Sequence, residues 1–427
     1  MRRRALSALP AVLLLGSCFP RDEAAPARNG GRAQAGTGTP YLPLYAALAA
    51  LEDGQGDGQL TALQIGDSHT AADGFSGRMR ELFQARFGDA GRGMLPPGIP
   101  FAAYRPAQVE VTAQGWHTLS SFGRAAAPGP FGLSGLRQRA EGTAEMTLTA
   151  RTPGGVCRVW VEALGQPGGG TLELRADTGA SVSLATAAAP APGPGGAIGR
   201  APLWLDLKAG PAAKAVVLRA GGDGPVDVLS WGAANGRRGV SYANLGTIGA
   251  TIDLVGRWDA DLIAAELARL QPALLLVAFG SNEGFDDNID PHAYERRYAN
   301  RLQTLRRAWP AAAAAVLGPP DGARRARAGH AGEACPGQSA WVRPPRLDAV
   351  RAAQRRVATA TGSGFWDWSA AMGGACSILA WAESVPPRAA PDRLHLLRPG
   401  YRATAEALFE DIMRGYDRYR GLPGKAG

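Results

Sequence analysis

The sequence predicts an α/β domain with a buried parallel sheet, interrupted near its start by a β-rich domain. A continuous apolar run at 274–279 is typical of a strand covered on both faces, and apolar periodicity predicts helices over 74–86 and 259–271. From about 100 to 235 this helical periodicity disappears, and short alternating segments separated by Gly- and Pro-rich turns predict a β-sandwich. The length of 427 residues exceeds one typical domain, which is consistent with an insertion.

The first chemically informative segment is Gly66-Asp67-Ser68, which follows a short apolar run ending at Ile65. A serine at the point where a strand breaks into a helix exposes its hydroxyl and places its backbone N–H at the positive end of the helix. Ser68 is therefore a candidate nucleophile and a candidate oxyanion donor. Asp67 is expected to organise the turn. The alternative is an ordinary turn, in which Gly-Asp-Ser tripeptides are common.

A second segment lies near the C-terminus, where Asp392 and His395 are three residues apart between Pro391 and Pro399. This spacing lets the carboxylate accept a hydrogen bond from one imidazole nitrogen while the other nitrogen faces a serine, which is the geometry of an acid–base relay. A helix is expected to begin near Pro399. The alternative is an Asp that caps this helix beside a solvated His.

Two further segments supply candidate oxyanion donors. Asn282 follows the apolar run at 274–279, and an amide there can donate to a developing oxyanion. In the glycine-punctuated turn at 244–251, a glycine allows a backbone N–H to approach a substrate closely, and we prefer Gly249 to Gly246 for this role. The alternative for both segments is a plain strand-to-helix connection.

Together these residues resemble the SGNH (GDSL-type) hydrolase family, named for its block residues Ser, Gly, Asn and His. The resemblance assigns these blocks to Ser68, Gly249, Asn282 and His395, with Asp392 completing a Ser-His-Asp triad. It implies a three-layer α/β/α sandwich with a parallel sheet and no cofactor. The blocks occur in the order of the family.

The sequence departs from the family pattern at two places. His69 follows the nucleophile where the founding motif has Leu, and the third block reads Gly-Ser-Asn-Glu at 280–283 instead of Gly-x-Asn-Asp. Neither change removes a catalytic group.

The insertion narrows the resemblance to bacterial peptidoglycan O-acetylesterases, in which a jelly-roll-like domain resembling a carbohydrate-binding module interrupts the SGNH domain. This resemblance implies an acetylated cell-wall or envelope polysaccharide as substrate. The segment around Trp366 and Trp368 also has the character of that subgroup. Because the two indoles alternate on a predicted strand, one is expected in the core and the other can line the substrate cleft.

The N-terminus is typical of a bacterial lipoprotein. Arginines at positions 2–4 precede a short apolar core, and Leu15-Gly16-Ser17-Cys18 resembles a lipobox. We therefore expect Cys18 to be acylated and the protein to lie in the periplasm, anchored to the outer membrane. The alternative is an ordinary signal peptide with an incidental cysteine. The predicted parts of the chain are a signal peptide (1–17), a flexible tether (18–40), a first hydrolase segment (41–99), the insert (100–235) and a second hydrolase segment (236–427).

The cysteines of an exported protein can form disulfides, and Cys335 and Cys376 are candidates for one. Closing the 41-residue separation between them would stabilise the fold by about 4 kcal/mol. Cys157 is then expected to remain as a buried thiol. No Cys/His cluster has the spacing of metal ligands, so no metal is expected.

The formal charge of +9 falls to +6 once the three arginines at 2–4 are removed with the signal peptide. The remaining arginines are scattered and accompany no nucleic-acid-binding motif, so no nucleic-acid partner is expected. Two alternatives to the esterase remain: a polysaccharide O-acetyltransferase of the same fold, and a non-catalytic glycan-binding envelope lipoprotein. The intact set of candidate catalytic residues argues against the second alternative.

Overall fold

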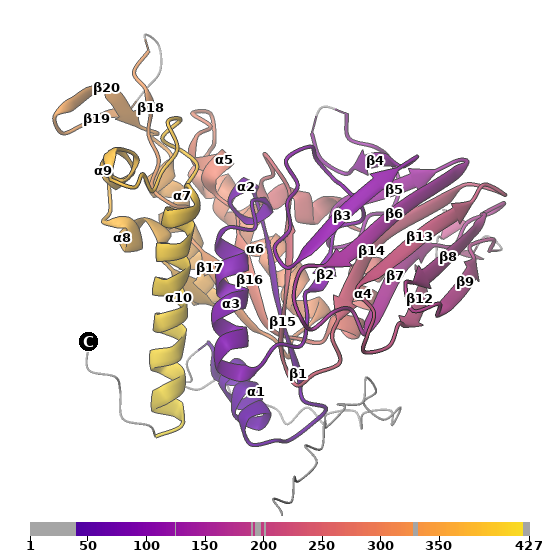
Figure 1. Ribbon diagram of the computed structural model, residues 1–427. Coiled ribbons are helices and arrows are strands. Elements are labelled where there is room, and N and C mark those ends of the chain that lie inside the picture. Colours follow the sequence, from indigo (N-terminus) through magenta and orange to yellow (C-terminus); the bar gives the residue numbers. More distant parts are fainter. Residues whose placement is uncertain are drawn as a thin grey trace, which may run out of the picture.

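The computed structural model describes residues 40–123, 125–188, 191–192, 198–199, 202–327 and 332–421. The predicted signal peptide, the lipidation site Cys18 and nearly all of the predicted tether lie outside these residues. The described chain forms an α/β domain and a β-sandwich that lie side by side (Figure 1). Within the described ranges, no helix has both the length and the apolar character needed to cross a membrane.

The centre of the α/β domain is a parallel sheet of five strands. Their order across the sheet is β15 (Gly239–Gly246), β1 (Gln59–Gly66), β16 (Pro272–Ala278), β17 (Ala313–Leu317) and β21 (Gly364–Trp366). The early strand β1 therefore lies between two strands that come after the insertion. This arrangement brings the ends of three strands far apart in the sequence to one edge of the sheet.

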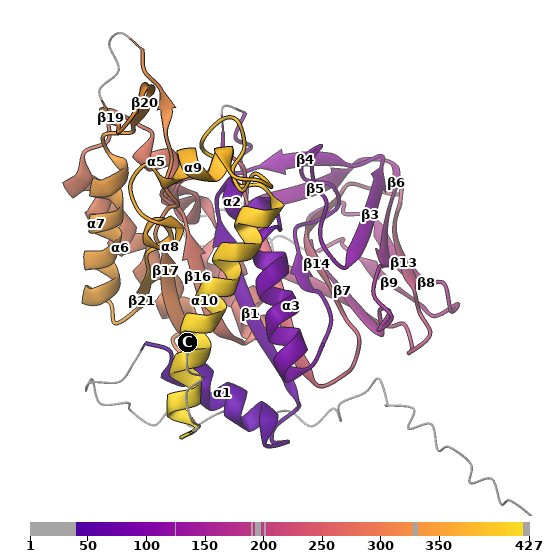
Figure 2. The same cartoon turned by 60° about the vertical axis from the view of Figure 1, so that its left-hand side comes forward.

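Helices cover both faces of this sheet (Figures 1 and 2). The helices on one face are α1 (Leu42–Glu52), α3 (Phe75–Phe87) and α10 (Arg398–Tyr419), and those on the other are α4 (Ala260–Leu270), α6 (Pro291–Ala308) and α7 (Leu347–Ala360). Alternate residues of β1 enter the two cores: Leu60 and Ala62 pack on the first face, and Leu63 and Ile65 on the second. The predicted α/β/α sandwich is confirmed.

The insert is a sandwich of two antiparallel sheets around its own apolar core. One sheet has the order β12 (Pro202–Lys208), β7 (Arg158–Leu164), β14 (Val226–Ala234), β5 (Leu136–Ala140) and β4 (His117–Ser120), and the other β3 (Val109–Gln114), β6 (Thr143–Ala150), β13 (Ala215–Gly221), β8 (Thr171–Ala176) and β9 (Ser181–Ala185). The short strand β2 (Gly93–Leu95) pairs with β14, so the first sheet draws in residues from before position 100. A separate pair of two-residue strands consists of β10 (Ala191–Pro192) and β11 (Ile198–Gly199).

The two domains share a buried polar contact. The backbone N–H of Leu133, in the insert, donates to Glu266 Oε2 on α4 at 2.6 Å, and Ser230 Oγ donates to Glu162 Oε2 on β7 at 2.9 Å. Glu162 and Glu266 are both fully buried. Burial raises the pKa of Glu162 to about 7, and burial together with the neighbouring Glu162 raises the pKa of Glu266. The pair therefore holds at least one proton at neutral pH.

We expect Glu162→Gln to reduce the loss of stability that the protein shows as pH rises. The folded state holds the Glu162 proton up to about pH 7, whereas the unfolded chain releases it near the ordinary value of 4.5, so stability falls as pH rises through this window. Glutamine keeps the shape and cannot ionise. Thermal unfolding at pH 5 and pH 8 should show a smaller drop in Tm for the variant than for the wild type. Glu145→Gln, an exposed change in the same sandwich, is the control, and equal drops in Tm for wild type and Glu162→Gln would contradict the prediction.

A small antiparallel sheet projects from the α/β domain near α9 (Ser377–Glu383), as Figure 1 shows. It has the order β18 (Arg324–Arg325), β20 (Gln338–Arg343) and β19 (Glu333–Cys335), and we call it the flap sheet. Cys335 at the end of β19 is disulfide-bonded to Cys376, the residue before α9. The disulfide fastens the flap sheet to the body of the domain.

Cys157 is buried, and the one cysteine besides Cys335 and Cys376 that could pair with it, Cys18, lies outside the described residues. One expectation about the two tryptophans is wrong. Trp366 ends β21, but Trp368 begins the short helix α8 (Trp368–Met372) because Asp367 caps that helix through the N–H of Ala370. Both indoles are buried in the core, so neither lines a cleft.

Candidate active site

The candidate site lies where the adjacent strands β15, β1 and β16 end. Ser68 begins the short helix α2 (Ser68–Ala71) after β1, Gly249 follows β15, and Asn282 lies in the short helix α5 (Ser281–Gly284) after β16. The chain runs from β1 to β15 on one side and then to β16 on the other, so β1 marks the place where the strand order reverses. Ligands of open α/β sheets bind at the carboxyl ends of the strands at such a place.

Ser68, His395 and Asp392 form a continuous hydrogen-bonded chain. Ser68 Oγ lies 3.0 Å from His395 Nε2, and His395 Nδ1 lies 2.7 Å from Asp392 Oδ2. The other carboxylate oxygen of Asp392 accepts from the backbone N–H groups of Leu394 and His395, each at 3.0 Å. The structure therefore brings together three residues that span 327 positions, in the geometry of a nucleophile, a base and an orienting carboxylate.

Asp392 remains charged in this arrangement. Burial raises the pKa of Asp392, but the hydrogen bonds from the His395 side chain and from the two backbone N–H groups lower it by more than burial raises it. The pKa of Asp392 therefore lies below its usual value. The side chains of His395 and Asp392 are 40% and 49% exposed, so substrate can reach the imidazole from solvent.

The turn that presents Ser68 is held by Asp67. Its side chain caps α2 by accepting from the His69 N–H at 3.0 Å, and its own N–H donates to the carbonyl of Ala278 on β16 at 3.1 Å. Burial raises the pKa of Asp67 to about 6. Replacing Gly66 with a larger residue would force the neighbouring backbone to move, since a Cβ there would lie 2.4 Å from the Ala278 carbonyl oxygen. Asp67 thus serves the turn, as the sequence suggested.

Backbone donors for an oxyanion are present at Ser68 and Gly249. Neither N–H is hydrogen-bonded to any described residue. Gly246 is different, because its N–H donates to Asn244 Oδ1 at 3.2 Å and an added Cβ would meet the Ala71 nitrogen at 2.1 Å. Gly249 has a φ of +75° and is exposed. The geometry favours Gly249 over Gly246 as the second backbone donor.

Asn282 is half-buried, and its side-chain amide donates to the carbonyl of Ala250 at 2.8 Å. Ala250 directly follows Gly249, so this hydrogen bond ties Asn282 to the loop that carries the second backbone donor. The amide has two N–H groups, and the bond to Ala250 uses one of them. The other is available to an oxyanion.

We expect Asn282→Ala to lower kcat for an aryl acetate by about 10²- to 10³-fold, the usual effect of losing one oxyanion donor. KM should change little, since the donor acts on charge that develops only in the transition state. Steady-state kinetics would measure both values, with Asn288→Ala, an exposed change in the loop after α5, as the matched control. An Asn282→Ala enzyme with nearly normal kcat would remove Asn282 from the oxyanion hole.

His69 and Tyr401 lie directly behind the triad, and the sequence analysis assigned no role to either. His69 is buried, its Nδ1 lies 3.0 Å from the Tyr401 hydroxyl, and the centroid of its ring lies 5.4 Å from that of His395. Burial, followed by the nearby His395, lowers the pKa of His69 to about 3, so this imidazole is neutral. A neutral ring adds no positive charge beside His395. The one sequence feature that pointed to this contact is the histidine directly after Ser68, where the family motif has Leu.

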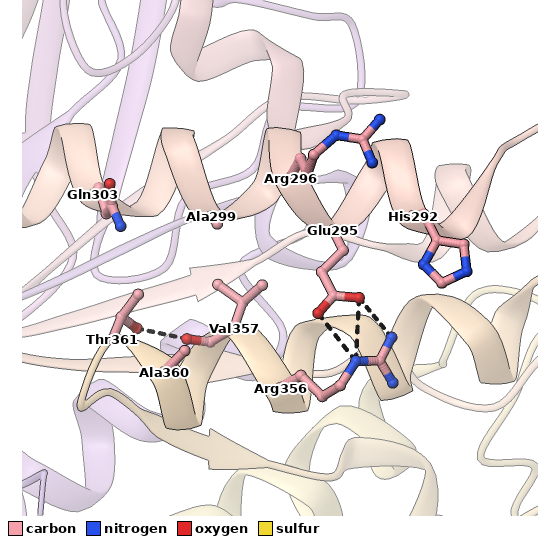
Figure 3. A pocket seen from close by; sticks show the side chains of 9 residues that line it. All are labelled: His292, Glu295, Arg296, Ala299, Gln303, Arg356, Val357, Ala360 and Thr361. Carbon is pink, nitrogen blue, oxygen red and sulfur yellow. Dashed lines mark hydrogen bonds and ion pairs between the residues drawn. The ribbon is translucent and has the colours of Figure 1, made fainter.

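A hollow between α6 and α7 is separate from this site (Figure 3). It has a volume of about 400 Å³, and the ion pair between Glu295 and Arg356 crosses it. Ser68, Asp392 and His395 do not line it, so it is separate from the candidate active site. In the part of the chain that the structure describes, no group of His, Cys, Asp and Glu side chains has the arrangement of a metal site.

Comparisons with known proteins agree with this geometry. The GDSL-like lipase/acylhydrolase family matches residues 217–403, a range that contains Gly249, Asn282, Asp392 and His395 but not Ser68, which lies before the insertion. A solved structure described as a peptidoglycan O-acetylesterase is 28% identical with a TM-score of 0.70, and the match covers 88% of this chain and 96% of that one.

More distant structures also match. An acetyl xylan esterase is 17% identical with a TM-score of 0.29, over 40% of this chain and 81% of that one. A family two carbohydrate esterase from Clostridium thermocellum is 12% identical with a TM-score of 0.28, over 66% and 95% of the two chains. Among curated proteins, none matches the sequence. Residues 217–403 match the GDSL-like lipase/acylhydrolase family, the α/β domain has the SGNH fold, and the chain is an esterase.

Proposed function

We propose that this protein removes O-acetyl groups from a cell-envelope carbohydrate, with peptidoglycan as the preferred candidate substrate. Ser68, His395 and Asp392 form its catalytic triad. The observation that carries the proposal is the hydrogen-bonded chain from Ser68 through His395 to Asp392 at the carboxyl edge of the sheet. The similarity to a peptidoglycan O-acetylesterase over both domains supports the choice of substrate class, since it includes the β-sandwich as well as the hydrolase domain.

Acylation follows from the geometry. With its own proton on Nδ1, directed at Asp392, His395 accepts the proton of Ser68 at Nε2 while Ser68 Oγ attacks the acetyl carbonyl. The N–H groups of Ser68 and Gly249 and the amide of Asn282 stabilise the tetrahedral oxyanion. His395 then gives its proton to the departing sugar oxygen, which leaves an acetyl ester on Ser68.

Deacylation repeats these steps with water. His395 takes a proton from water as the water oxygen attacks the acetyl carbonyl. It returns that proton to Ser68 Oγ when the second tetrahedral intermediate collapses and acetate leaves. A sugar hydroxyl in the place of this water would make the same site an O-acetyltransferase, so the acceptor must be tested directly.

The test is acetate release by the purified, lipid-free protein from three substrates: O-acetylated peptidoglycan, acetylated xylan and an aryl acetate. Release from peptidoglycan that exceeds release from xylan, and that Ser68→Ala lacks, supports the proposal. Cleavage of the aryl acetate alone would support Ser68 as the nucleophile and contradict the proposal that the substrate is a carbohydrate. Transfer of acetyl groups to added muropeptides without net acetate release would identify a transferase.

We further propose that the protein is an envelope lipoprotein anchored through Cys18. The support is the sequence Leu15-Gly16-Ser17-Cys18 after a basic and then apolar leader. Intact-mass measurement of the mature protein from a bacterial host should show a chain that begins at Cys18 with added acyl groups. A mature chain with an unmodified Cys18, or with Cys18 in a disulfide, would contradict lipidation.

A further inference from the structure

We propose that a cavity beside the triad, between the flap sheet and the loop that carries Asp392, binds a carboxylate on the acetylated sugar or on a substituent of that sugar. We call this cavity the arginine subsite. It has a volume of about 450 Å³. Its lining consists of Phe285, Ala323, Arg324, Arg325, Arg327, Trp341, Pro391, Asp392 and Leu394. The inference rests on the proposed function for the position of the scissile ester.

The positive charge of the arginine subsite is not fully neutralised by the protein. Arg324 is held by both carboxylate oxygens of Asp287, at 2.6 and 2.9 Å. Arg325 and Arg327 are exposed, and neither forms an ion pair with a described residue. Three arginines therefore face the cavity, whereas Asp392 is the one carboxylate in its lining. A planar guanidinium with paired N–H groups matches the two oxygens of a carboxylate.

Trp341 fixes the cationic wall of the cavity. It lies opposite Arg325 in the pairing of β18 with β20, and the guanidinium of Arg325 lies 5.1 Å from the centre of the indole. Arg393, from the loop between Asp392 and His395, approaches the same indole at 5.1 Å. A guanidinium that is already positioned on an aromatic face loses less freedom when it binds an anion. This contact also joins the flap sheet to the catalytic loop.

The cavity is placed to receive part of a substrate whose ester lies at Ser68. Asp392 belongs to both sites, because it lines the cavity and holds the Nδ1 proton of His395. Leu394, the residue before His395, lies in the same wall as Pro391. Their apolar surfaces and that of Phe285 suit the face of a sugar ring. A ligand in the arginine subsite is thus a direct neighbour of the ester-cleaving groups.

Binding of small ligands without acetyl esters tests the subsite independently of catalysis. Calorimetric titration of the wild-type protein at low salt would compare three probes: N-acetylmuramic acid, N-acetylmuramyl dipeptide and the neutral disaccharide N,N′-diacetylchitobiose. We expect at least one of the two acidic probes to bind about tenfold more tightly than the neutral one, since hydrogen bonds to charged groups are the stronger ones. Equal affinity for all three probes would overturn the proposal.

Matched double variants assign this preference to the cavity. Arg325→Gln/Arg327→Gln should abolish the preference for the acidic probes, while Arg237→Gln/Arg418→Gln should keep it. Arg237 and Arg418 are likewise exposed, but they lie before β15 and near the end of the 22-residue helix α10, remote from the carboxyl edge of the sheet. Both doubles remove two positive charges, so an equal loss in both would show a nonspecific charge effect and overturn the assignment.

The outcomes separate this proposal from the proposed function. If the protein releases no acetate from any glycan but still prefers the acidic probes, the arginine subsite is supported and the carbohydrate esterase assignment is wrong. If it releases acetate but shows no preference among the probes, the esterase assignment is supported and the arginine subsite is wrong. The lactyl carboxylate of N-acetylmuramic acid becomes an amide in the dipeptide, whose free carboxylate belongs to the peptide. Tighter binding of N-acetylmuramic acid therefore assigns the recognised carboxylate to the sugar, tighter binding of the dipeptide assigns it to the peptide, and equal binding shows that the subsite accepts a carboxylate in either position.

Discussion

Replacing Ser68 with alanine is expected to lower kcat for an aryl acetate by at least about 10⁴-fold without unfolding the protein. The substitution removes the hydroxyl that is hydrogen-bonded to His395 Nε2, so no acyl-enzyme can form. The backbone N–H of residue 68 and the Asp67 cap remain, which keeps the turn and one oxyanion donor in place. Burst kinetics and steady-state turnover with the aryl ester measure the loss.

The control for this experiment is Ser183→Ala, an exposed serine on β9 at the edge of the sandwich. Its activity should equal that of the wild type. Thermal unfolding of Ser68→Ala should give a Tm close to that of the wild-type protein, because Ser68 lies on the surface of the turn and belongs to none of the apolar cores. Substantial turnover by a folded Ser68→Ala protein would remove Ser68 as the nucleophile.

The fold was predictable where the burial pattern follows the local period of the sequence. In β13, Val216, Leu218 and Ala220 are buried and the residues between them are not, and this alternation identifies a strand with one face in the core. The apolar run of β16 is equally clear, because parallel strands are covered on both sides. In such segments, the pattern that predicts the strand lies within the strand itself.

Local sequence patterns do not predict segments whose burial depends on distant partners. Four of the five residues of β5 are buried, among them the polar Arg137 and Gln138. Arg137 forms an ion pair with Asp227 at 3.1 Å, 90 positions away, and Gln138 donates to Thr118 Oγ1 at 2.8 Å on the neighbouring strand. No local periodicity of apolar residues predicts a strand of this kind. Trp368 likewise reads as the next residue of a strand until Asp367 is known to cap a helix.

The candidate site likewise contains residues that the sequence predicts and residues that only the tertiary structure reveals. Its reacting groups were recognisable because an acyl transfer needs particular residue types, and these stand in short conspicuous segments such as Asp392-x-x-His395. The groups around them depend on tertiary structure. His69 meets Tyr401, 332 positions later, and Arg325 meets Trp341 across two short strands. These supporting contacts have no sequence signature that can be read without the fold.

We expect Asp392→Asn to lower kcat by about 10⁴-fold, an effect close to that of removing the nucleophile. Asparagine has nearly the same shape, so it tests the charge and the hydrogen-bond polarity of Asp392 directly. If its amide nitrogen donates to His395 Nδ1, the imidazole must carry its proton on Nε2, where it can no longer accept the proton of Ser68. An asparagine also fails to stabilise the imidazolium that forms when Ser68 attacks.

The pH dependence makes this prediction more specific. Because its hydrogen bonds hold the pKa of Asp392 below the usual value, the wild-type carboxylate is ionised throughout the range above about pH 4, and its own titration does not limit activity there. The loss in Asp392→Asn should therefore be of similar size at pH 6 and pH 8, with KM for the aryl acetate nearly unchanged. A variant that regains wild-type kcat anywhere between these values would show that Asp392 only positions the imidazole, and that its charge contributes nothing to the reaction.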